Sequence, residues 1–286
     1  MSTQYTTQPQ SLRFFQPVGP HIHVERYDGD SPACVLIHGG GDGAFIWDSF
    51  APVLARQFTT IAVDLRGHGG SGWDRSRHYE MNGYVSDLAH VVNRSDLDQL
   101  VLIGHSLGAH IAAYLCERYA SRVIACVLVD YAPELNAEGI QQAKSLLRES
   151  LQFYPTPDQY LAWLKGTRHL ADSETLGRIA ARSVKRVGDG FRPKLDPAFV
   201  DAFPEFRPEE GQVLWSLLKQ QTCPTLVVRG AGSAVLSHAT AKRLAEVLPR
   251  GELATVNAAG HSVMLDNPVE FERVVLNFLT RVLAER

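Results

Sequence analysis

The sequence predicts an α/β protein with a mostly parallel eight-stranded sheet, helices on both faces and a helical lid inserted between two core strands. Three observations predict this fold class. Short apolar runs alternate with helical patterns at both ends of the chain. Most of these runs are apolar on both faces, as in parallel strands that are covered by helices on either side. The alternation stops between Tyr131 and Thr222, where helical patterns follow one another without a convincing strand.

Eight apolar runs are the expected strands, and the first two are expected to form an antiparallel pair. They lie at residues 12–15, 22–27, 33–37, 59–63, 100–103, 123–129, 225–229 and 253–256. Apolar spacing places the helices of the core at residues 47–56, 84–93, 109–119 and 268–283. Pro268 begins the last of these, because proline suits the first turn of a helix.

Four further helical patterns fill the region without strands, at residues 137–153, 157–164, 173–187 and 208–220. We therefore expect a core at residues 1–133 and 223–286, with a helical lid at residues 134–222. Open α/β sheets bind their ligands at the carboxyl ends of the strands, and an insertion at this point would cover that edge.

Composition and charge exclude several classes of function. The chain has 286 residues, is 45% hydrophobic and carries a formal net charge of −3, which suits one large core and gives no electrostatic case for nucleic acid. No apolar run approaches the roughly 18 residues of a membrane helix. The segment Met1 to Gln10 is polar, unlike a secretory signal. We expect a cytoplasmic protein, monomeric or homodimeric, that takes a small-molecule substrate and has no cofactor or metal.

The four cysteines lie far apart, in or beside apolar runs, and show no metal-binding spacing. They are Cys34, Cys116, Cys126 and Cys223. We expect them to be reduced, buried thiols without a catalytic role.

The strongest local motif is Gly104-His105-Ser106-Leu107-Gly108, which follows an apolar run and precedes a helical pattern. Strand, G-x-S-x-G and helix is the context of a nucleophile elbow, in which a strained turn lifts the serine hydroxyl above the sheet. The glycines let strand and helix approach closely. The helix N-terminus beside Ser106 carries free N–H groups and partial positive charge, which suit an oxyanion.

A serine hydroxyl needs a base to become a nucleophile, and His261 is the candidate among the 11 histidines. It lies in a loop between the last expected strand and the last helix. In a sheet of this order that loop returns to the carboxyl edge, beside Ser106.

The chain resembles the α/β-hydrolase fold superfamily. The matching segments are His38-Gly39, Asp64 to Ser71, Gly104 to Gly108 and Gly260-His261, and the strand order agrees across the whole core. The resemblance implies that Ser106 is the nucleophile and His261 the base. It also implies an oxyanion hole made by the backbone N–H groups of Leu107 and Gly40, with Gly41 as the alternative to Gly40.

The third member of the expected triad departs from the usual pattern. Most of the superfamily place an acid after the strand that corresponds to residues 225–229, but residues 230–237 contain no carboxylate. Some members hold the acid at the end of the preceding strand, where this chain has Asp130. We therefore expect Asp130 to be the acid. In the alternative, Asp130 only caps a turn, and Ser106 works with His261 as a dyad.

The lid has a local excess of positive charge. Residues 140–194 contain ten Lys and Arg against five Asp and Glu. Since arginine binds carboxylates bidentately, we expect Arg148 and Arg168, which lie beside apolar patterns, to hold an anionic substrate. Tyr131 and His105 are expected to line the pocket, with His105 turned away from Ser106.

The leading functional prediction is a serine hydrolase that cleaves an ester, amide or C–C bond in a small, carboxylated metabolite through an acyl-enzyme. The lid, Asp130 and the arginines together resemble a subgroup that includes 2-(acetamidomethylene)succinate hydrolase and the C–C hydrolases of ring-cleavage products. Two alternatives remain open. One is a cofactor-free oxygenase or lyase in which His261 deprotonates the substrate, and the other is a non-hydrolytic ligand receptor.

Overall fold

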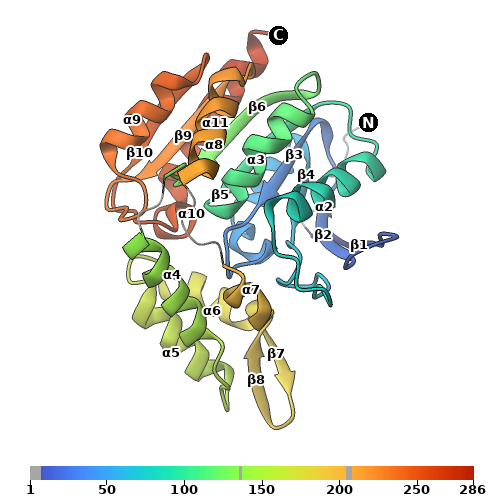
Figure 1. Ribbon diagram of the computed structural model, residues 1–286, viewed down its shortest axis with the longest axis vertical. Helices are drawn as coiled ribbons and strands as arrows, with labels where there is room; N and C mark the ends of the chain where they lie inside the picture. Colours follow the sequence, from blue (N-terminus) through green and yellow to red (C-terminus); the bar gives the residue numbers. More distant parts are fainter. Residues whose placement is uncertain (1–7, 135–136, 204–207) are drawn as a thin grey trace.

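An eight-stranded sheet lies between two layers of helices in the computed structural model (Figure 1), which describes residues 8–134, 137–203 and 208–286. Most of the polar segment at residues 1–10 lies outside these ranges. The strand order is β1-β2-β4-β3-β5-β6-β9-β10; β2 pairs antiparallel with β1 and β4, and all other pairs are parallel. The strands are β1 (Gln10–Phe14), β2 (Ile22–Tyr27), β3 (Asp30–Ile37), β4 (Phe58–Val63), β5 (Leu100–His105), β6 (Val123–Val129), β9 (Thr225–Gly230) and β10 (Gly251–Val256). The predicted fold class is confirmed.

The central strands are buried on both faces, which explains their continuous apolar runs. Every residue of β5 and β6 is buried. Side chains along β3 alternate between two apolar clusters, with Val35 and Ile37 in one and Cys34 and Leu36 in the other. Helices α2 (Met81–Arg94), α3 (Leu107–Arg118) and α9 (His238–Val247) contribute to the first cluster, and α11 (Pro268–Ala284) contributes to the second.

One expected helix is interrupted. In place of a helix over residues 47–56, the chain forms the 3-10 turn η1 (Ala44–Trp47) and then α1 (Ala51–Leu54). Pro52 lacks a backbone N–H and suits only the first turn of a helix, so the helix begins just before it.

The inserted segment, residues 134–222, divides into two parts by its contacts. Most of it lies beyond one end of the sheet, whereas its last helix returns beside α3 (Figure 1) and packs against α3 and α9. Its elements are α4 (Ala137–Ser150), α5 (Pro157–Thr167), α6 (Ser173–Ser183), β7 (Val184–Val187), β8 (Gly190–Pro193), α7 (Pro197–Asp201) and α8 (Pro208–Gln220). By packing, α8 is therefore part of a helical layer over the sheet.

The expectation that this segment contains no strand is wrong at one place. β7 and β8 form a two-stranded antiparallel hairpin, so the helix expected over residues 173–187 ends at Ser183. Val184 and Val187 favour strand over helix because they are β-branched. Gly188 has a φ of 61° in the turn, a conformation that glycine adopts at little cost.

None of the helices in the described ranges is long and apolar enough to cross a membrane.

Candidate active site

Ser106 sits in a strained turn between β5 and α3, as the motif predicts. Its backbone has φ 52° and ψ −116°, and its N–H donates to the Val129 carbonyl at 3.0 Å. The two glycines are required by close packing. A Cβ on Gly104 would lie 2.3 Å from the Gly108 carbonyl oxygen, and one on Gly108 would lie 2.2 Å from that of Ile37.

His261 and Asp130 meet although 131 positions separate them. His261 Nδ1 lies 2.8 Å from Asp130 Oδ2, with the Asp130 side chain fully buried and the His261 side chain 35% exposed. Asp130 follows β6 directly, and His261 follows β10 in the loop before α10 (Val263–Asp266). Since Nδ1 faces the carboxylate, Nε2 is the ring nitrogen that is left to exchange a proton with a substrate or a nucleophile.

Two further donors hold the Asp130 carboxylate. The Gly230 N–H donates to Oδ1 at 3.1 Å, and the Ser233 hydroxyl donates to Oδ2 at 2.5 Å. Ser233 Oγ in turn accepts from the backbone N–H groups of Val235 and Leu236. The loop after β9, which lacks a carboxylate, thus contributes a hydroxyl that binds Asp130. Ser233 was not predicted from the sequence. The only signal for it was the absence of a carboxylate from residues 230–237.

The glycine-rich loop after β3 is held by a neutral histidine. Gly41 N–H donates to His68 Nε2 at 3.0 Å, while His68 Nδ1–H donates to the Arg66 carbonyl at 2.8 Å. Burial, reinforced by the neighbouring His38, lowers the pKa of His68 to about 3. The Gly41 N–H, the alternative oxyanion donor, is therefore already engaged. Leu107, as the first residue of α3, has a backbone N–H without an acceptor in its own helix.

The inserted segment covers this glycine-rich loop. A Cβ built on Gly40 would lie 3.1 Å from the Phe199 ring of α7, and one on Gly41 would lie 2.3 Å from Leu147 of α4. Both helices thus contact the loop that carries the expected oxyanion donor.

His105 and Tyr131 are both buried beside the elbow. His105 Nε2–H donates to the carbonyl of His261 at 3.0 Å, and the two rings lie 4.6 Å apart. Burial, together with the adjacent His261, holds the pKa of His105 well below its usual value. Its contacts therefore support the His261 backbone. Tyr131 packs its ring 5.4 Å from that of His110.

The two expected lid arginines differ in position. Arg168 Nη2 lies 2.5 Å from Asp42 Oδ1, and Arg168 Nη1 is buried without a hydrogen-bond partner among the described residues. Burial alone would lower the pKa of Arg168, but Asp42 outweighs it and the pKa is raised. Arg148 is 60% exposed and pairs with Asp201 at 3.6 Å. Its partner is an exposed residue of α7 and not a residue of the site.

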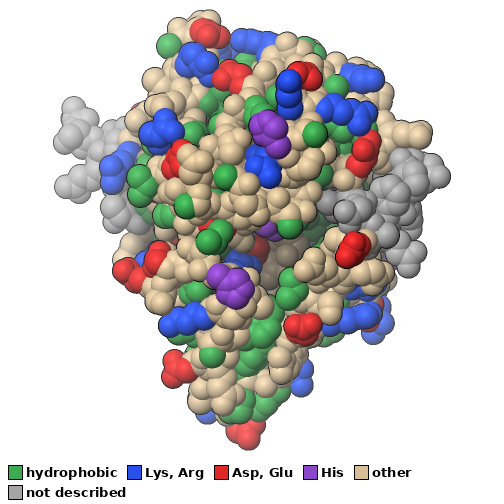
Figure 2. All heavy atoms as spheres, turned by 90° about the vertical axis from the view of Figure 1, so that its left-hand side faces the viewer, with side chains coloured by type: hydrophobic (Ala, Val, Ile, Leu, Met, Phe, Trp, Pro, Cys, Tyr) green, Lys and Arg blue, Asp and Glu red, His purple; other side chains and the backbone are tan. Residues whose placement is uncertain are grey.

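Two carboxylates that lie at the site, Asp42 and Asp266, were not predicted as site residues from the sequence. Asp42, which binds Arg168, directly follows the glycine-rich loop but was not predicted as a site residue. Asp266 ends α10 and accepts from the Gly260 N–H at 2.9 Å. Burial raises the pKa of Asp266. Figure 2 shows the surface hollowed between the core and the inserted segment, with histidine, basic and acidic side chains around the hollow.

Comparison with known proteins identifies the family and agrees with the fold. Residues 34–274 match the alpha/beta hydrolase family, so the superfamily resemblance is confirmed. The chain is 26% identical over 254 residues to the 2-(acetamidomethylene)succinate hydrolase of Mesorhizobium japonicum, covering 89% of this chain and 90% of the relative. It is 25% identical over 255 residues to the 2-hydroxy-6-oxo-2,4-heptadienoate hydrolase of Pseudomonas putida, covering 86% and 88%. A crystal structure of E-2-(acetamidomethylene)succinate hydrolase superposes with a TM-score of 0.84 at 25% identity, covering 95% of this chain and 99% of that one.

Proposed function

We propose that this chain, which belongs to the alpha/beta hydrolase family, is a serine hydrolase that uses Ser106, His261 and Asp130 as a catalytic triad. The observation that carries the proposal is the 2.8 Å contact between His261 Nδ1 and the fully buried Asp130 carboxylate. Two hydrogen bonds tie this pair to the strained turn of Ser106: the Ser106 N–H donates to the carbonyl of Val129, which precedes Asp130, and His105 Nε2–H donates to the carbonyl of His261.

The proposed reaction proceeds through an acyl-enzyme. His261 Nε2 accepts the proton of the Ser106 hydroxyl as the oxygen attacks the substrate carbonyl. Asp130 stabilises the imidazolium that forms, and the N–H groups of Leu107 and Gly40 receive the developing oxyanion. Such a pair of donors contributes several kcal/mol, roughly 3–4 for each donor removed in other hydrolases. The leaving group takes the proton from His261, and water then cleaves the acyl-enzyme by the same path.

The proposed substrate is a small metabolite with a carboxylate, cleaved at an ester, amide or C–C bond. Arg168 supports this class, because its Nη1 is buried without a partner among the described residues and a carboxylate would satisfy it. The names of the two relatives denote carboxylate substrates, a succinate and a heptadienoate. Residues 134–203 act in this proposal as a lid, whose helices α4 and α7 contact the glycine-rich loop.

The four cysteines are free thiols, which fits the expected reducing environment of the cytoplasm.

An active-site probe tests the nucleophile. A fluorophosphonate should label the wild-type chain once and should not label Ser106→Ala. The control is Ser145→Ala, which removes an exposed hydroxyl from α4 and should leave labelling unchanged. A folded wild-type protein that is not labelled, or labelling that survives in Ser106→Ala, would overturn the proposal and favour the oxygenase, lyase or receptor alternatives.

A further inference from the structure

Three of the four cysteines gather at the edge of the sheet opposite Ser106. Cys223 lies in the link between α8 and β9, and its Sγ is 4.0 Å from Cys116 Sγ near the C-terminal end of α3. Cys126 of β6 also interacts with Cys116. All three are free thiols and all are buried, and the function proposed above makes no use of them.

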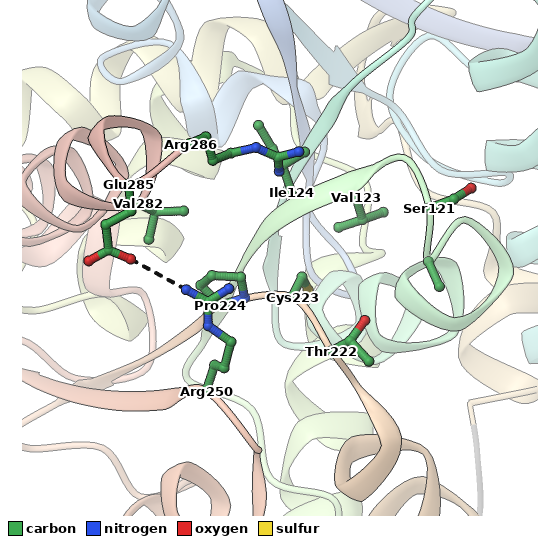
Figure 3. A pocket seen from close by; sticks show the side chains of 11 residues that line it. Ser121, Val123, Ile124, Thr222, Cys223, Pro224, Arg250, Val282, Glu285 and Arg286 are labelled. Atoms are coloured by element: carbon green, nitrogen blue, oxygen red, sulfur yellow. Dashed lines mark hydrogen bonds and ion pairs between the residues drawn. The ribbon is translucent and has the colours of Figure 1, made fainter.

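Cys223 differs from the other two because it borders a cavity. The cavity has a volume of about 450 Å³ and lies at the amino ends of β6, β9 and β10 (Figure 3). Its lining includes Thr222, Cys223, Ile124 and Arg250, and the last of these pairs with Glu285 at 3.3 Å. Cys223 is therefore the cysteine of this group that borders the cavity, and Cys116 Sγ lies 4.0 Å from its sulfur.

Hydrogen bonds around Cys223 favour its ionised form. The pKa of Cys223 is lowered, chiefly because the Cys116 thiol can donate to its thiolate and also because the Thr225 hydroxyl lies 3.9 Å away. The pKa of Cys116 is raised by its contacts with Cys126 and Cys223. Since the thiolate is the reactive species, these contacts support Cys223 as the attacking thiol.

We propose that Cys223 and Cys116 form a reversible oxidation site, in which a hydroperoxide converts the two thiols into a disulfide. The Cys223 thiolate attacks one peroxide oxygen, which breaks the O–O bond and gives a sulfenic acid and, with a proton, water. The Cys116 sulfur then attacks the Cys223 sulfur. The S–S bond forms, the S–O bond breaks and a second water leaves. Two thiols are oxidised and one hydrogen peroxide molecule is reduced to two waters.

The disulfide would join the C-terminal end of α3 to the start of β9, and the opposite ends of both elements lie at the candidate active site. α3 begins directly after Ser106, and β9 ends at Gly230, whose N–H holds Asp130. The bond would close a separation of 107 residues, so oxidation is expected to raise the temperature of thermal unfolding.

The test treats the purified full chain with hydrogen peroxide and measures free thiols, intact mass and linked peptides. We expect a fall from four free thiols to two, a mass loss of two hydrogens, and one cross-linked pair that contains Cys116 and Cys223. Dithiothreitol should restore the thiols and reverse the rise in unfolding temperature. Peptide mapping of the wild type needs no variant, so a folding defect in a mutant does not affect this result.

Matched variants sharpen the assignment. Cys116→Ser should stop at a sulfenic acid on Cys223 that dimedone traps, whereas Cys34→Ser, which removes a fully buried thiol from β3, should form the disulfide as the wild type does. A disulfide that contains Cys126, a rate of thiol loss that is unchanged in Cys223→Ser, or direct oxidation of Cys223 to a sulfinic acid would overturn the proposal. None of these readouts depends on hydrolase activity.

Discussion

Asp130 and Arg168 are charged residues of the same site, but they come from different regions of the chain. They also differ in whether their polar atoms have hydrogen-bond partners. Asp130 ends a central strand, is fully buried and binds three donors from His261, Gly230 and Ser233. Arg168 comes from the inserted segment and is 21% exposed. It binds the Asp42 carboxylate through one nitrogen, while its Nη1 is buried without a partner in the part of the chain that the structure describes.

Under the proposed function, this difference assigns the reaction to Asp130 and the selectivity for substrates to Arg168. A carboxylate whose donors are all in place before substrate arrives is suited to holding an imidazole in one orientation. A buried donor without an acceptor costs about 1–3 kcal/mol, which an anionic ligand recovers when it binds. We therefore expect changes at Asp130 to affect turnover of every substrate, and changes at Arg168 to affect only substrates that carry the matching charge.

The largest expected effect is that of Asp130→Asn. Asparagine tolerates the positive φ of 46° at this position, so the fold should persist. The amide cannot stabilise the imidazolium, and kcat should fall by about 10³–10⁴-fold. Turnover of a p-nitrophenyl ester measures this, and circular dichroism checks the fold.

Asp266→Asn is the matched control for Asp130→Asn. Asp266 is a half-buried carboxylate near the same histidine, but it binds the Gly260 N–H and not the imidazole. Its substitution should cost much less turnover. Near-normal activity of Asp130→Asn would leave Ser106 and His261 as a dyad and would remove the contrast with Arg168.

The second effect is on selectivity. Arg168→Gln keeps a donor for Asp42 but removes the charge. KM for a carboxylated ester should therefore rise by about 10–100-fold, which corresponds to the free energy of one hydrogen bond to a charged group. KM for the neutral ester should hardly change.

Arg148→Gln controls for the loss of a positive charge from the same segment. Because Arg148 is exposed and pairs with Asp201, this variant should keep the selectivity of the wild type. Equal losses on charged and neutral esters in Arg168→Gln would show that Arg168 supports structure alone.

The last effect concerns the glycine-rich loop and changes the pH dependence of stability, not turnover or selectivity. The pKa of His68 is about 3 in the folded chain and about 6.5 when unfolded, so only the unfolded state takes up a proton between these values. The stability contributed by neutral His68 is complete above pH 6.5 and is lost as the pH falls toward 3. The loss is about 1.4 kcal/mol per pH unit.

Urea unfolding of the wild type and His68→Gln between pH 4 and 7 measures this contribution. The slope of the unfolding free energy against pH should be shallower in the variant by about 1.4 kcal/mol per pH unit, which corresponds to the uptake of one proton. Parallel slopes would mean that His68 takes up its proton in the folded chain, and that Gly41 is not held by a neutral ring.

Much of the fold followed from local patterns, and two of the three exceptions have local causes as well. Continuous apolar runs predicted the central strands because these are buried on both faces, whereas the edge strands β1 and β10 are only partly buried. The prediction of one helix over residues 47–56 did not take into account that Pro52 suits only the first turn of a helix. The hairpin at residues 184–193 was missed because its four-residue strands are too short for a periodic pattern. The position of α8 over the sheet also had no local signal, since it depends on contacts with α3 and α9.

By itself, the sequence determined the elbow at Ser106, because strand, G-x-S-x-G and helix are consecutive and Gly104 packs against Gly108 within the motif, although Gly108 is required by its contact with the distant Ile37 of β3. Only the tertiary structure decided how the other groups meet. His261 reaches Asp130 across 131 positions, Ser233 reaches Asp130 across 103, and Arg168 reaches Asp42 across 126. Such pairs leave no periodic trace in a single chain, because they depend on where strand ends and loops converge. For that reason motifs could predict Ser106 and His261, whereas the Ser233 hydroxyl that donates to Asp130 and the partner of Arg168 became visible only in the fold.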